Sequence, residues 1–331
     1  MKQILIYGAI NDVHLTRVAN LLVKQGLQVY FVDPVAMSNT AVKISNKCGI
    51  SDEFYAISFV TNKPELIDLN NIVFWRRNKR RIPTFYNEQE QHLHYTFAEI
   101  DNFLDGLINF YQTIELSATT ARFEHEHKLF QLGIAAKVGL LVPPTIISNN
   151  KIEILNFVTQ YNECIVKPLK HPVWSPPVNQ PDKGATFLVN IVNAQEVKAA
   201  DEDSFSHYPL IFQRNIPKNY ELRIVCVGEQ CVAFKIDSQV NQKAKIDWRR
   251  ATKELSISQV VIPNELEGLL VKYLNVTGLG YGVFDFIFDL EGNYIFLECN
   301  SDGQWAFLEE VDNKCPVAPL FAQQLIELAK H

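Results

Sequence analysis

Long hydrophobic runs are absent from this chain of 331 residues. No apolar segment approaches the roughly 20 residues that a membrane-spanning helix needs, so we expect no association with a membrane. The N-terminal sequence MKQILIYGAINDVH contains too short an apolar stretch for a secretory signal and is typical of a first β-strand. The sequence therefore predicts a cytoplasmic protein.

An excess of positive charge is also missing, since the formal net charge is −6. A protein with this balance has no overall electrostatic attraction for nucleic acid, so we expect no nucleic-acid partner. The six cysteines contain no Cys-x-x-Cys pair, and most of them lie in apolar segments. We therefore expect reduced core cysteines in a cytoplasmic protein, without disulfides or a zinc site.

Glycine is scarce where a phosphate-binding loop would need it. Residues 3–7, 16–25 and 28–32 are predicted as strand, helix and strand, an order typical of a parallel α/β half. The turn after the first strand contains only Gly8, which disfavours a dinucleotide-binding motif. Residues 171–184 are rich in proline and poor in glycine, and we interpret them as a lid that orders over a ligand.

Carboxylates inside an apolar hairpin are the strongest functional signal in the sequence. Two apolar runs, 283–288 and 294–297, flank five turn-forming residues, which predicts a β-hairpin. If the tip of the turn is Glu291–Gly292, Asp285 lies directly opposite Glu298. Two like charges that face each other destabilise a strand pair.

A bound cation would reverse the sign of that interaction. Side chains alternate along a strand, so Glu298 and Asn300 share one face. Asp285, Glu298 and Asn300 offer only oxygen ligands, which suit Mg²⁺ better than zinc. The sequence therefore predicts a magnesium site, and the alternative is an edge hairpin whose polar residues face water.

Two groups of basic residues point to an anionic ligand. Lys167 ends an apolar strand predicted at 163–168, where a lysine is costly unless it meets an anion such as phosphate. Residues 76–81 (RRNKRR) form the one dense basic run, which is either a solvated loop or a contact for an acidic ligand.

Apolar periodicity predicts the remaining elements. Strands are expected at 72–75, 145–147, 186–192, 210–213, 221–227 and 230–235, and helices at 88–110, 123–138, 152–160, 194–203, 265–278 and 315–331. The predicted fold class is α/β followed by α+β. The predicted domains are 1–118, 119–208 with the lid loop, and 209–331 with the metal site.

Several segments resemble a known family. The order of Lys128, Lys167, Gln213–Ile216, Glu221–Arg223, Asp285 and Glu298–Asn300 resembles the ATP-grasp ligases over about residues 120–331. The segments VFWRRNKRRIP, HKLFQLGIAAKVGLLVPPT, ELRIVCVG, DWR and FLECNSDGQWAFLEE are similar to the graspetide synthetases, the microviridin-type ATP-grasp enzymes that macrocyclise ribosomal peptides. This likeness covers nearly the whole chain and implies an ATP-grasp fold with an N-terminal α/β pre-ATP-grasp domain.

The resemblance also implies roles for individual residues. Asp285, Glu298 and Asn300 would hold Mg²⁺, as two ions, at the terminal phosphates of ATP. The other assigned residues are Lys128 and Lys167 on the phosphates, Gln213, Asn215 and Ile216 at the adenine edge, Glu221 on the ribose, Arg223 on the transferred phosphate and Arg249 on the oxyanion or acyl phosphate. The alternatives are that Lys128 and Arg249 are surface charges and that Glu221 and Arg223 form cross-strand salt bridges.

Such an enzyme activates an Asp or Glu side chain of a precursor peptide as an acyl phosphate and joins it to a Thr or Ser hydroxyl or a Lys amine. The resemblance therefore implies a precursor peptide, leader plus core, as partner, and it is compatible with a homodimer. Glu196, Glu202 and Asp203 on the predicted acidic helix would attract a basic leader residue, and the alternative is a solvated face.

Two other functions stay open. One is a ligase that adds free amino acids or glutamate, and the other is a non-catalytic nucleotide-binding partner. The complete set of metal ligands argues against a binding module.

Overall fold

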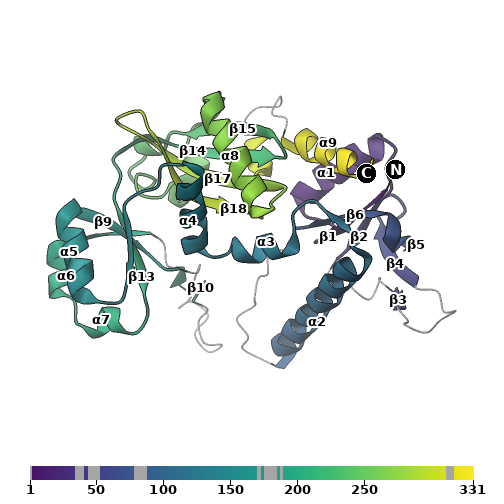
Figure 1. The fold of residues 1–331 in the computed structure, drawn as a ribbon, viewed down its shortest axis with the longest axis horizontal. Coiled ribbons are helices and arrows are strands. Elements are labelled where there is room, and N and C mark those ends of the chain that lie inside the picture. Colours follow the sequence, from purple (N-terminus) through teal and green to yellow (C-terminus); the bar gives the residue numbers. More distant parts are fainter. Residues whose placement is uncertain are drawn as a thin grey trace.

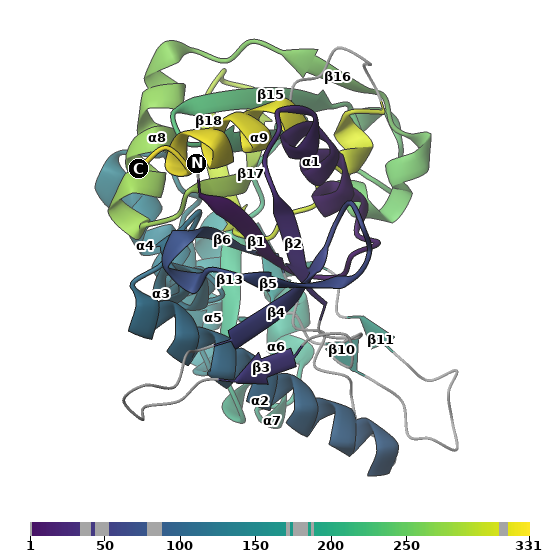
Figure 2. The same ribbon diagram turned by 90° about the vertical axis from the view of Figure 1, so that its right-hand side faces the viewer.

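Sheets form the centre of the molecule, and helices cover their faces (Figures 1 and 2). The computed structural model describes residues 2–33, 41–43, 53–77, 88–169, 173–174, 185–186, 189–310 and 317–331. Within these ranges the strands form a seven-stranded, a five-stranded and a four-stranded sheet, together with the short pair β10 (Val173–Trp174) and β11 (Ala185–Thr186).

The N-terminal sheet is mixed rather than wholly parallel. Its parallel part consists of β2 (Val29–Val32), β1 (Gln3–Tyr7), β6 (Ile72–Arg76) and β7 (Ile114–Glu115), which confirms the predicted β-α-β opening around α1 (Val13–Lys24). Its antiparallel edge consists of β3 (Ala41–Lys43), β4 (Glu53–Ser58) and β5 (Pro64–Ile67). The sequence analysis assigns no strand to these three short edge segments. The long helix α2 (Glu88–Tyr111) packs its C-terminal half on this sheet.

The small sheet, with strand order β12-β9-β13-β8, is antiparallel and lies at the far end of the molecule from the chain termini (Figure 1). Its strands are β8 (Thr145–Ser148), β9 (Glu163–Lys167), β12 (Asn190–Asn193) and β13 (Leu210–Arg214), and its helices are α5 (Lys151–Tyr161), α6 (Ala194–Ala199) and α7 (Asp203–Ser206). The single helix predicted at 194–203 is therefore wrong. The extended backbone of Ala200, with ψ of 145°, ends α6 and separates it from α7.

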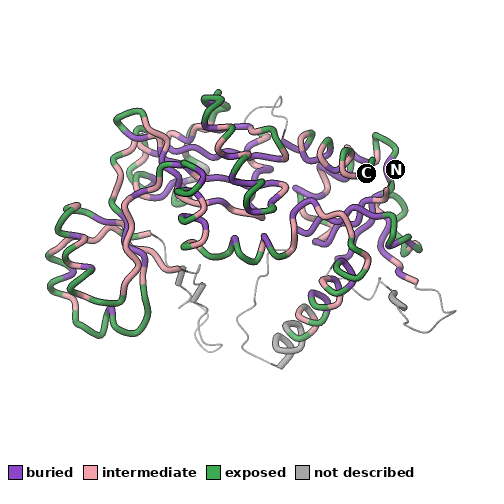
Figure 3. The backbone as a smooth tube through the Cα atoms, in the orientation of Figure 1, coloured by how far each residue is buried: buried purple, intermediate pink, exposed green. Residues whose placement is uncertain are grey.

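The large sheet, with strand order β16-β15-β14-β17-β18, is antiparallel throughout. It contains β14 (Lys218–Val227), β15 (Gln230–Ile236), β16 (Ile257–Val260), β17 (Tyr281–Asp289) and β18 (Tyr294–Asn300). Apolar side chains on one face, including Leu222, Ile224 and Phe284, pack against α4 (Lys128–Val138) and α8 (Asn264–Thr277). Figure 3 shows this sheet as mostly buried, with the exposed residues on the outer side of the helices.

The opposite face of the large sheet has two halves. On β14 and β17 the half formed by Val225, Val227, Tyr281 and Val283 joins one apolar cluster with residues of β1, β2 and β6 and with the C-terminal helix α9 (Val317–Leu328). The other half carries polar residues such as Glu221 and Asp285 at the same alternation. A single strand face therefore passes from the interior core to a polar wall at Arg223 and Asp285.

The helix predicted at 123–138 is two helices, α3 (Thr119–Glu124) and α4. His125 is buried between them, where its Nδ1 lies 3.1 Å from the carbonyl oxygen of Ala121 and its Nε2 lies 3.0 Å from the hydroxyl of Tyr273. Gln131 donates to the carbonyl of His125. These contacts provide hydrogen-bond partners for the His125 ring and carbonyl at the break between the helices, and apolar spacing does not predict them.

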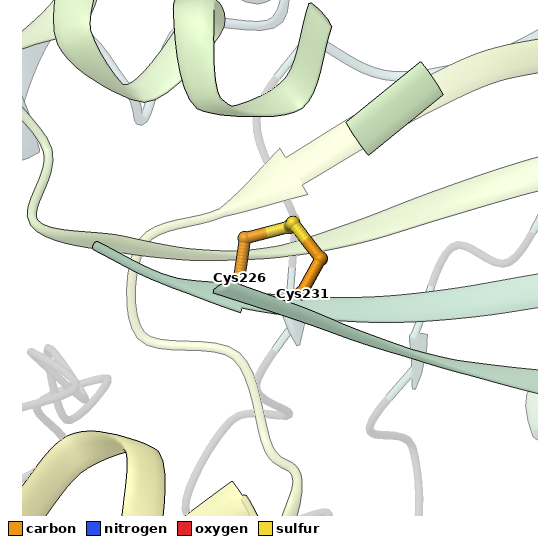
Figure 4. The surroundings of a disulfide bond; sticks show 2 residues. All are labelled: Cys226 and Cys231. Atoms are coloured by element: carbon orange, nitrogen blue, oxygen red, sulfur yellow. A yellow bond between two sulfur atoms is a disulfide. The ribbon is translucent and has the colours of Figure 1, made fainter. Parts of the chain in front are cut away.

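Cysteine chemistry differs from the prediction at one pair. Cys226 and Cys231 face each other across the β14–β15 hairpin and form a disulfide, with their Cα atoms 4.1 Å apart (Figure 4). The expectation that all six cysteines are reduced is therefore wrong for these two, because the hairpin places them at opposed positions. Cys164 and Cys299 are free and buried, as predicted. None of the described helices has the length and apolar character that crossing a membrane requires.

Candidate active site

A pocket lies between the small sheet and the polar half of the large sheet. It encloses about 960 Å³ that is partly open to solvent. Every residue assigned to ATP, metal or catalysis lines it except Arg223 and Asn300, which form hydrogen bonds with the proposed metal-site carboxylates. The lining residues from this set are Lys128, Lys167, Gln213, Asn215, Ile216, Glu221, Arg249, Asp285 and Glu298.

The metal-site carboxylates are paired as the sequence predicts. Asp285 on β17 lies directly opposite Glu298 on β18. The register shifts between Asp285 and Phe286, because Leu297 is an extra residue in β18 and forms a bulge. Leu297 and Glu298, although consecutive, therefore both line the pocket. The bulge gives the same wall an apolar residue and a carboxylate side by side.

Hydrogen bonds link the three proposed metal ligands to one another and to Arg223. Nη1 of Arg223 donates to both oxygens of Asp285, at 2.7 and 3.1 Å. Nδ2 of Asn300 donates at 3.3 Å to Asp285 Oδ2 and to Glu298 Oε1. The alternative of a cross-strand salt bridge for Arg223 is thus realised, with Asp285 as its partner. β18 does lie at the edge of the sheet, but the alternative of polar residues that face water is wrong, because the side chains of Asp285 and Glu298 are only 13% and 18% exposed and line a pocket.

These donors fit a hard cation. Two carboxylates and one amide gather at one point, and a half-turn of the Asn300 amide exchanges its nitrogen for its oxygen beside them. Across the described residues, no group of three or more His, Cys, Asp or Glu side chains is placed to hold a metal ion. A site with three protein ligands at this point would include the amide oxygen of Asn300.

The pKa values of the two carboxylates are shifted in opposite directions. Burial raises the pKa of Asp285 to about 6, although the nearby Arg223 opposes the rise. Burial would also raise the pKa of Glu298, but the positive charges of Lys167, Arg249 and Lys128 outweigh it and lower that pKa to about 2. Glu298 is therefore the permanently ionised member of the pair.

The two lysines approach Glu298 from different parts of the fold. Lys167 ends β9 of the small sheet, and burial lowers its pKa to about 8 while Glu298 opposes that change. Lys128 begins α4, donates to the Pro168 carbonyl at 3.0 Å and also has its pKa lowered by burial. Because its side chain is partly buried in the pocket and points to a backbone carbonyl, the surface-charge alternative for Lys128 is wrong.

Arg249 is held in place by a nearby aspartate. Its Nε and Nη2 each lie 2.8 Å from an oxygen of Asp247, and its Nη1 lies 3.9 Å from Glu298 Oε1. The side chain is 40% exposed, yet this two-point contact with Asp247 and the neighbouring Glu298 fix its direction. It lies at the pocket mouth rather than on an unrelated surface.

The segment predicted to meet adenine has structural bonds of its own. The Gln213 side chain donates to the Thr145 hydroxyl at 2.8 Å, and the Asn215 backbone N–H donates to the Glu163 carbonyl at 3.2 Å. Glu221 accepts from Lys218 Nζ at 2.9 Å and has its pKa raised by burial, which Lys218 opposes. The pocket is lined by all four residues assigned to the adenine and ribose, which are Gln213, Asn215, Ile216 and Glu221. Their assignment to the nucleotide stays a prediction.

The acidic residues proposed for docking lie away from the pocket on the small-sheet helices. The Glu196 carboxylate accepts from the Asn193 backbone N–H at 2.8 Å and closes the capping box of α6. Glu202 precedes α7, Asp203 begins it, and both side chains are exposed. Glu196 therefore has a structural role, whereas Glu202 and Asp203 are available on the surface.

Parts of two predicted features lie outside the described residues. These are 78–81 of the basic run and 170–172, 175–184 and 187–188 in and around the lid loop. Arg76 and Arg77 are described, and both are buried. Arg76 pairs with Asp105, and Arg77 donates to the Gly303 carbonyl at 3.1 Å. A solvated loop is therefore the wrong interpretation for these two arginines.

Several pocket residues have no role in the sequence interpretation, among them Lys218, Asp247 and Leu297. Asp247 stands in the DWR segment beside Arg249, and that spacing is a signal that could assign it as the orienting partner. Lys218 begins β14 and belongs to no recognisable motif. Leu297 is apolar among apolar neighbours, and strict alternation would turn it away from the pocket.

The fold class follows from this arrangement. An α/β domain is followed by two antiparallel sheets with a pocket between them, which defines an ATP-grasp fold. Solved structures agree. The chain matches a RiPP-associated ATP-grasp ligase of Chryseobacterium gregarium, in complex with ADP and a leader and core peptide, with a TM-score of 0.84 and 24% identity over 99% of this chain and 97% of that one.

Two further solved structures have the same fold. The macrocyclase MdnC of Microcystis aeruginosa MRC, bound with the precursor peptide MdnA, matches with a TM-score of 0.80 and 24% identity over 98% of this chain and 99% of that one. The ATP-grasp ligase PsnB, complexed with a minimal precursor, Mg and ADP, matches with a TM-score of 0.73 and 19% identity over 99% and 98%. No protein-family model matches the sequence, and no curated protein shows significant similarity to it. At these identities the similarity establishes the fold, which the motifs predict.

Proposed function

We propose that this chain is an ATP- and Mg²⁺-dependent peptide macrocyclase of the graspetide type. The observation that carries the proposal is the opposed pair Asp285 and Glu298 in the pocket, with the positive charges of Lys128, Lys167, Arg223 and Arg249 beside it. Three relatives in fold, solved with ADP or a precursor peptide, support the same function.

In this proposal the terminal phosphoryl group of ATP passes to a carboxylate of the peptide, which gives an acyl phosphate and ADP. A hydroxyl or amine of the same peptide then attacks the acyl carbon, loses its proton, and expels phosphate. Bound Mg²⁺, as two ions, would neutralise charge on the phosphates. The chemistry needs positioning and charge compensation, so no nucleophile from the enzyme is required.

The chain's own residues divide this work. Lys128 and Lys167 would bind the phosphates, and the apolar Leu297 and Ile287 would contact the base or ribose. Arg223 of β14, which pairs with Asp285 of β17, would contact the transferred phosphoryl group. Arg249, fixed by Asp247, would donate to the oxyanion or acyl phosphate as charge develops.

The decisive assay incubates the protein with ATP, Mg²⁺ and a peptide encoded beside its gene that contains Thr or Ser and Asp or Glu. Cyclisation removes the mass of one water for each link, which mass spectrometry detects. A gain equal to an amino-acid residue would instead identify a ligase that adds amino acids. Nucleotide binding without any change in the peptide would favour a binding partner.

The metal assignment has its own test in Asp285→Asn. Its shape is nearly unchanged, so we expect the fold to remain while turnover falls, most severely at low Mg²⁺. Glu291→Gln, in the exposed turn of the same hairpin, is the matched control and should keep wild-type turnover. Wild-type rates for Asp285→Asn at low Mg²⁺ would remove Asp285 from the metal site.

For the precursor peptide we propose docking of a basic leader residue on Glu202 and Asp203. Reversal of both charges to lysine should weaken precursor binding and leave ATP binding intact. Glu196 is left unchanged because its carboxylate caps α6. Glu153→Lys on the neighbouring helix α5 is a control for charge reversal elsewhere on the same lobe. Unchanged precursor affinity in the Glu202 and Asp203 variant would contradict this docking site.

A further inference from the structure

One peptide unit joins the N-terminal domain to the catalytic arginine. The carbonyl oxygen of Gln304 accepts from Nε and Nη2 of Arg223, at 3.1 and 2.8 Å. The N–H of Trp305, at the other end of the same peptide bond, donates to Nε2 of His14 at 3.1 Å. His14 lies in the first turn of α1, in a different domain from Arg223.

The protonation of His14 follows from its partners. A backbone N–H can only donate, so Nε2 of His14 must be unprotonated and the ring hydrogen must be on Nδ1. Nδ1 lies 2.9 Å from Oδ1 of Asp12, which accepts that hydrogen. Asp12 is fixed in turn, because its carboxylate caps α1 by accepting from the backbone N–H groups of His14 and Leu15.

The hydrogen bonds form one continuous chain with all donors in the same sense. It runs from the Arg223 guanidinium through the Gln304–Trp305 peptide group and the His14 ring to the Asp12 carboxylate. A positive group at one end and a negative group at the other polarise each bond between them, which strengthens the chain. Its interior is shielded from water, since His14 is 7%, Trp305 0% and Arg223 6% exposed.

We propose that His14, supported by Asp12, is a positioning residue for Arg223. By holding the Gln304–Trp305 peptide group, it fixes the carbonyl that binds two nitrogens of the guanidinium. The remaining nitrogen, Nη1, is thereby directed at Asp285 and the proposed phosphoryl site. This inference rests on the proposed function only for its effect on turnover, since the geometry of Arg223 can be measured without substrate.

Acid should disconnect the chain of hydrogen bonds. A proton on Nε2 removes the acceptor for Trp305, so the peptide group loses its anchor. The charged groups that face the ring are Asp12, which favours that proton, and Arg77 and Arg17, which oppose it. Burial adds to the arginines and lowers the pKa of His14 below its usual value. The wild-type chain should therefore keep the anchor at neutral pH and lose it only in acid.

The test compares two substitutions at His14 with a control on the same helix. His14→Leu removes the acceptor, whereas His14→Gln offers an amide oxygen near the position of Nε2 without a titrating group. Asn20→Leu, on an exposed position of α1, controls for changes to the helix. The first readout is the ¹⁵N–¹H signal of Arg223 Nε, assigned by its loss in Arg223→Lys.

We expect His14→Leu to shift that signal and speed its exchange with water, while His14→Gln and Asn20→Leu leave it near the wild-type position. Peptide turnover should fall about tenfold in His14→Leu, the order expected when one buried hydrogen bond is lost, with little change in the KM for ATP. His14→Gln should recover most of this loss, and its Arg223 Nε signal should lack most of the shift that the wild-type signal shows in acid.

Three outcomes would overturn the proposal. One is an Arg223 signal in His14→Leu that matches Asn20→Leu, and another is an equal loss of turnover in both His14 variants. The third is an acid-induced shift of the Arg223 signal that is as large in His14→Gln as in the wild-type chain. If the wild-type chain modifies no peptide, the proposed function fails, but the Arg223 signal still decides whether His14 positions the guanidinium.

Discussion

Lys167 and Glu298 come from different sheets, and each changes the protonation of the other. The lysine belongs to β9 and the glutamate to β18, and their charges meet across the pocket. Burial raises the pKa of Glu298 and lowers that of Lys167, so it favours the neutral form of each. The positive charges of Lys167, Arg249 and Lys128 outweigh burial at Glu298 and keep it ionised. The pKa of Lys167 is about 8, so its charge changes with pH near that value.

The first prediction concerns Lys167 and ATP. Burial lowers its pKa to about 8, so the free protein loses this charge as the pH rises above 8. ATP binds the protonated lysine, so its dissociation constant should rise about tenfold for each pH unit above that value, as expected for uptake of one proton. Isothermal titration at several pH values measures this. Lys167→Arg keeps its charge, and equal slopes in both proteins would contradict the prediction.

A second prediction concerns the stability of the helix break at His125. Burial lowers the pKa of His125 from its ordinary value of 6.5 to about 4, so the unfolded chain binds a proton more readily than the folded chain. Stability should therefore fall as the pH drops from 6.5 towards 4, by about 2 kcal/mol between pH 7 and 5. Urea unfolding at both pH values measures the change. His125→Gln should reduce that pH dependence and the exposed His127→Gln should not, so equal dependence in the two variants would argue against His125.

Single residues explain how much of the site is predictable. Asp285, Glu298 and Lys167 are charged groups among apolar neighbours, so the cost of burying them indicates a ligand from the sequence alone. His14 has no such signal, because a histidine in a first helical turn is ordinary and its partner Trp305 is 291 residues away. Only the folded chain brings the two together.

At the scale of elements, the β17–β18 hairpin shows both the strength and the limit of periodicity. The predicted pairing of Asp285 with Glu298 is confirmed, but the Glu291–Gly292 tip on which it rested is wrong. The pairs beside the turn, such as Phe286 with Phe296, are centred on Glu291, and the bulge at Leu297 shifts the register so that Asp285 meets Glu298. The turn is held by Asp289, whose carboxylate accepts from the backbone N–H groups of Glu291 and Asn293. Alternation fails at Leu297, because a bulge adds a residue to one strand without changing the apolar pattern. The helix breaks at 125–127 and at 200 escape prediction for the related reason that tertiary contacts end those helices.

The bulge leads to a third prediction. Leu297→Ala should weaken ATP binding by about tenfold, since the truncated side chain loses apolar contact worth about 1–2 kcal/mol. The metal-site pairing should persist, because the backbone register is unchanged. Leu290→Ala, 69% exposed in the turn of the same hairpin, is the matched control. Fluorescent-nucleotide titration compares them, and equal affinities would show that Leu297 does not contact the nucleotide.

At the scale of the whole molecule, the N-terminal domain and the large sheet share one core. Trp75 of β6 stacks on Phe321 of α9 at 5.3 Å between ring centroids and meets the edge of Tyr281 of β17 at 6.3 Å. The neighbouring Phe74 points to the other face of β6 and packs only within the N-terminal domain cluster. Sequence patterns predict the apolar residues here, but not that residues from both sides of position 118 belong to one cluster.

A fourth prediction uses this adjacent pair. Trp75→Ala and Phe74→Ala should each cost about 3–5 kcal/mol, the range for loss of a large buried aromatic side chain. Hydrogen exchange should distinguish them. Trp75→Ala should accelerate exchange in β17 and α9, whereas Phe74→Ala should act mainly in the N-terminal sheet and α2. Equal exchange patterns would show that the two halves are not coupled through Trp75.

The shared core also indicates which lobe would move if the pocket opens. The small-sheet lobe would move, because the large sheet is packed on the N-terminal domain through a buried core. Lys167 would move with the small-sheet lobe, while Glu298 would stay with the large sheet. We therefore expect opening to separate two of the charged residues proposed to bind ATP and Mg²⁺, so that the movement that weakens the binding of ADP also opens its path out of the pocket.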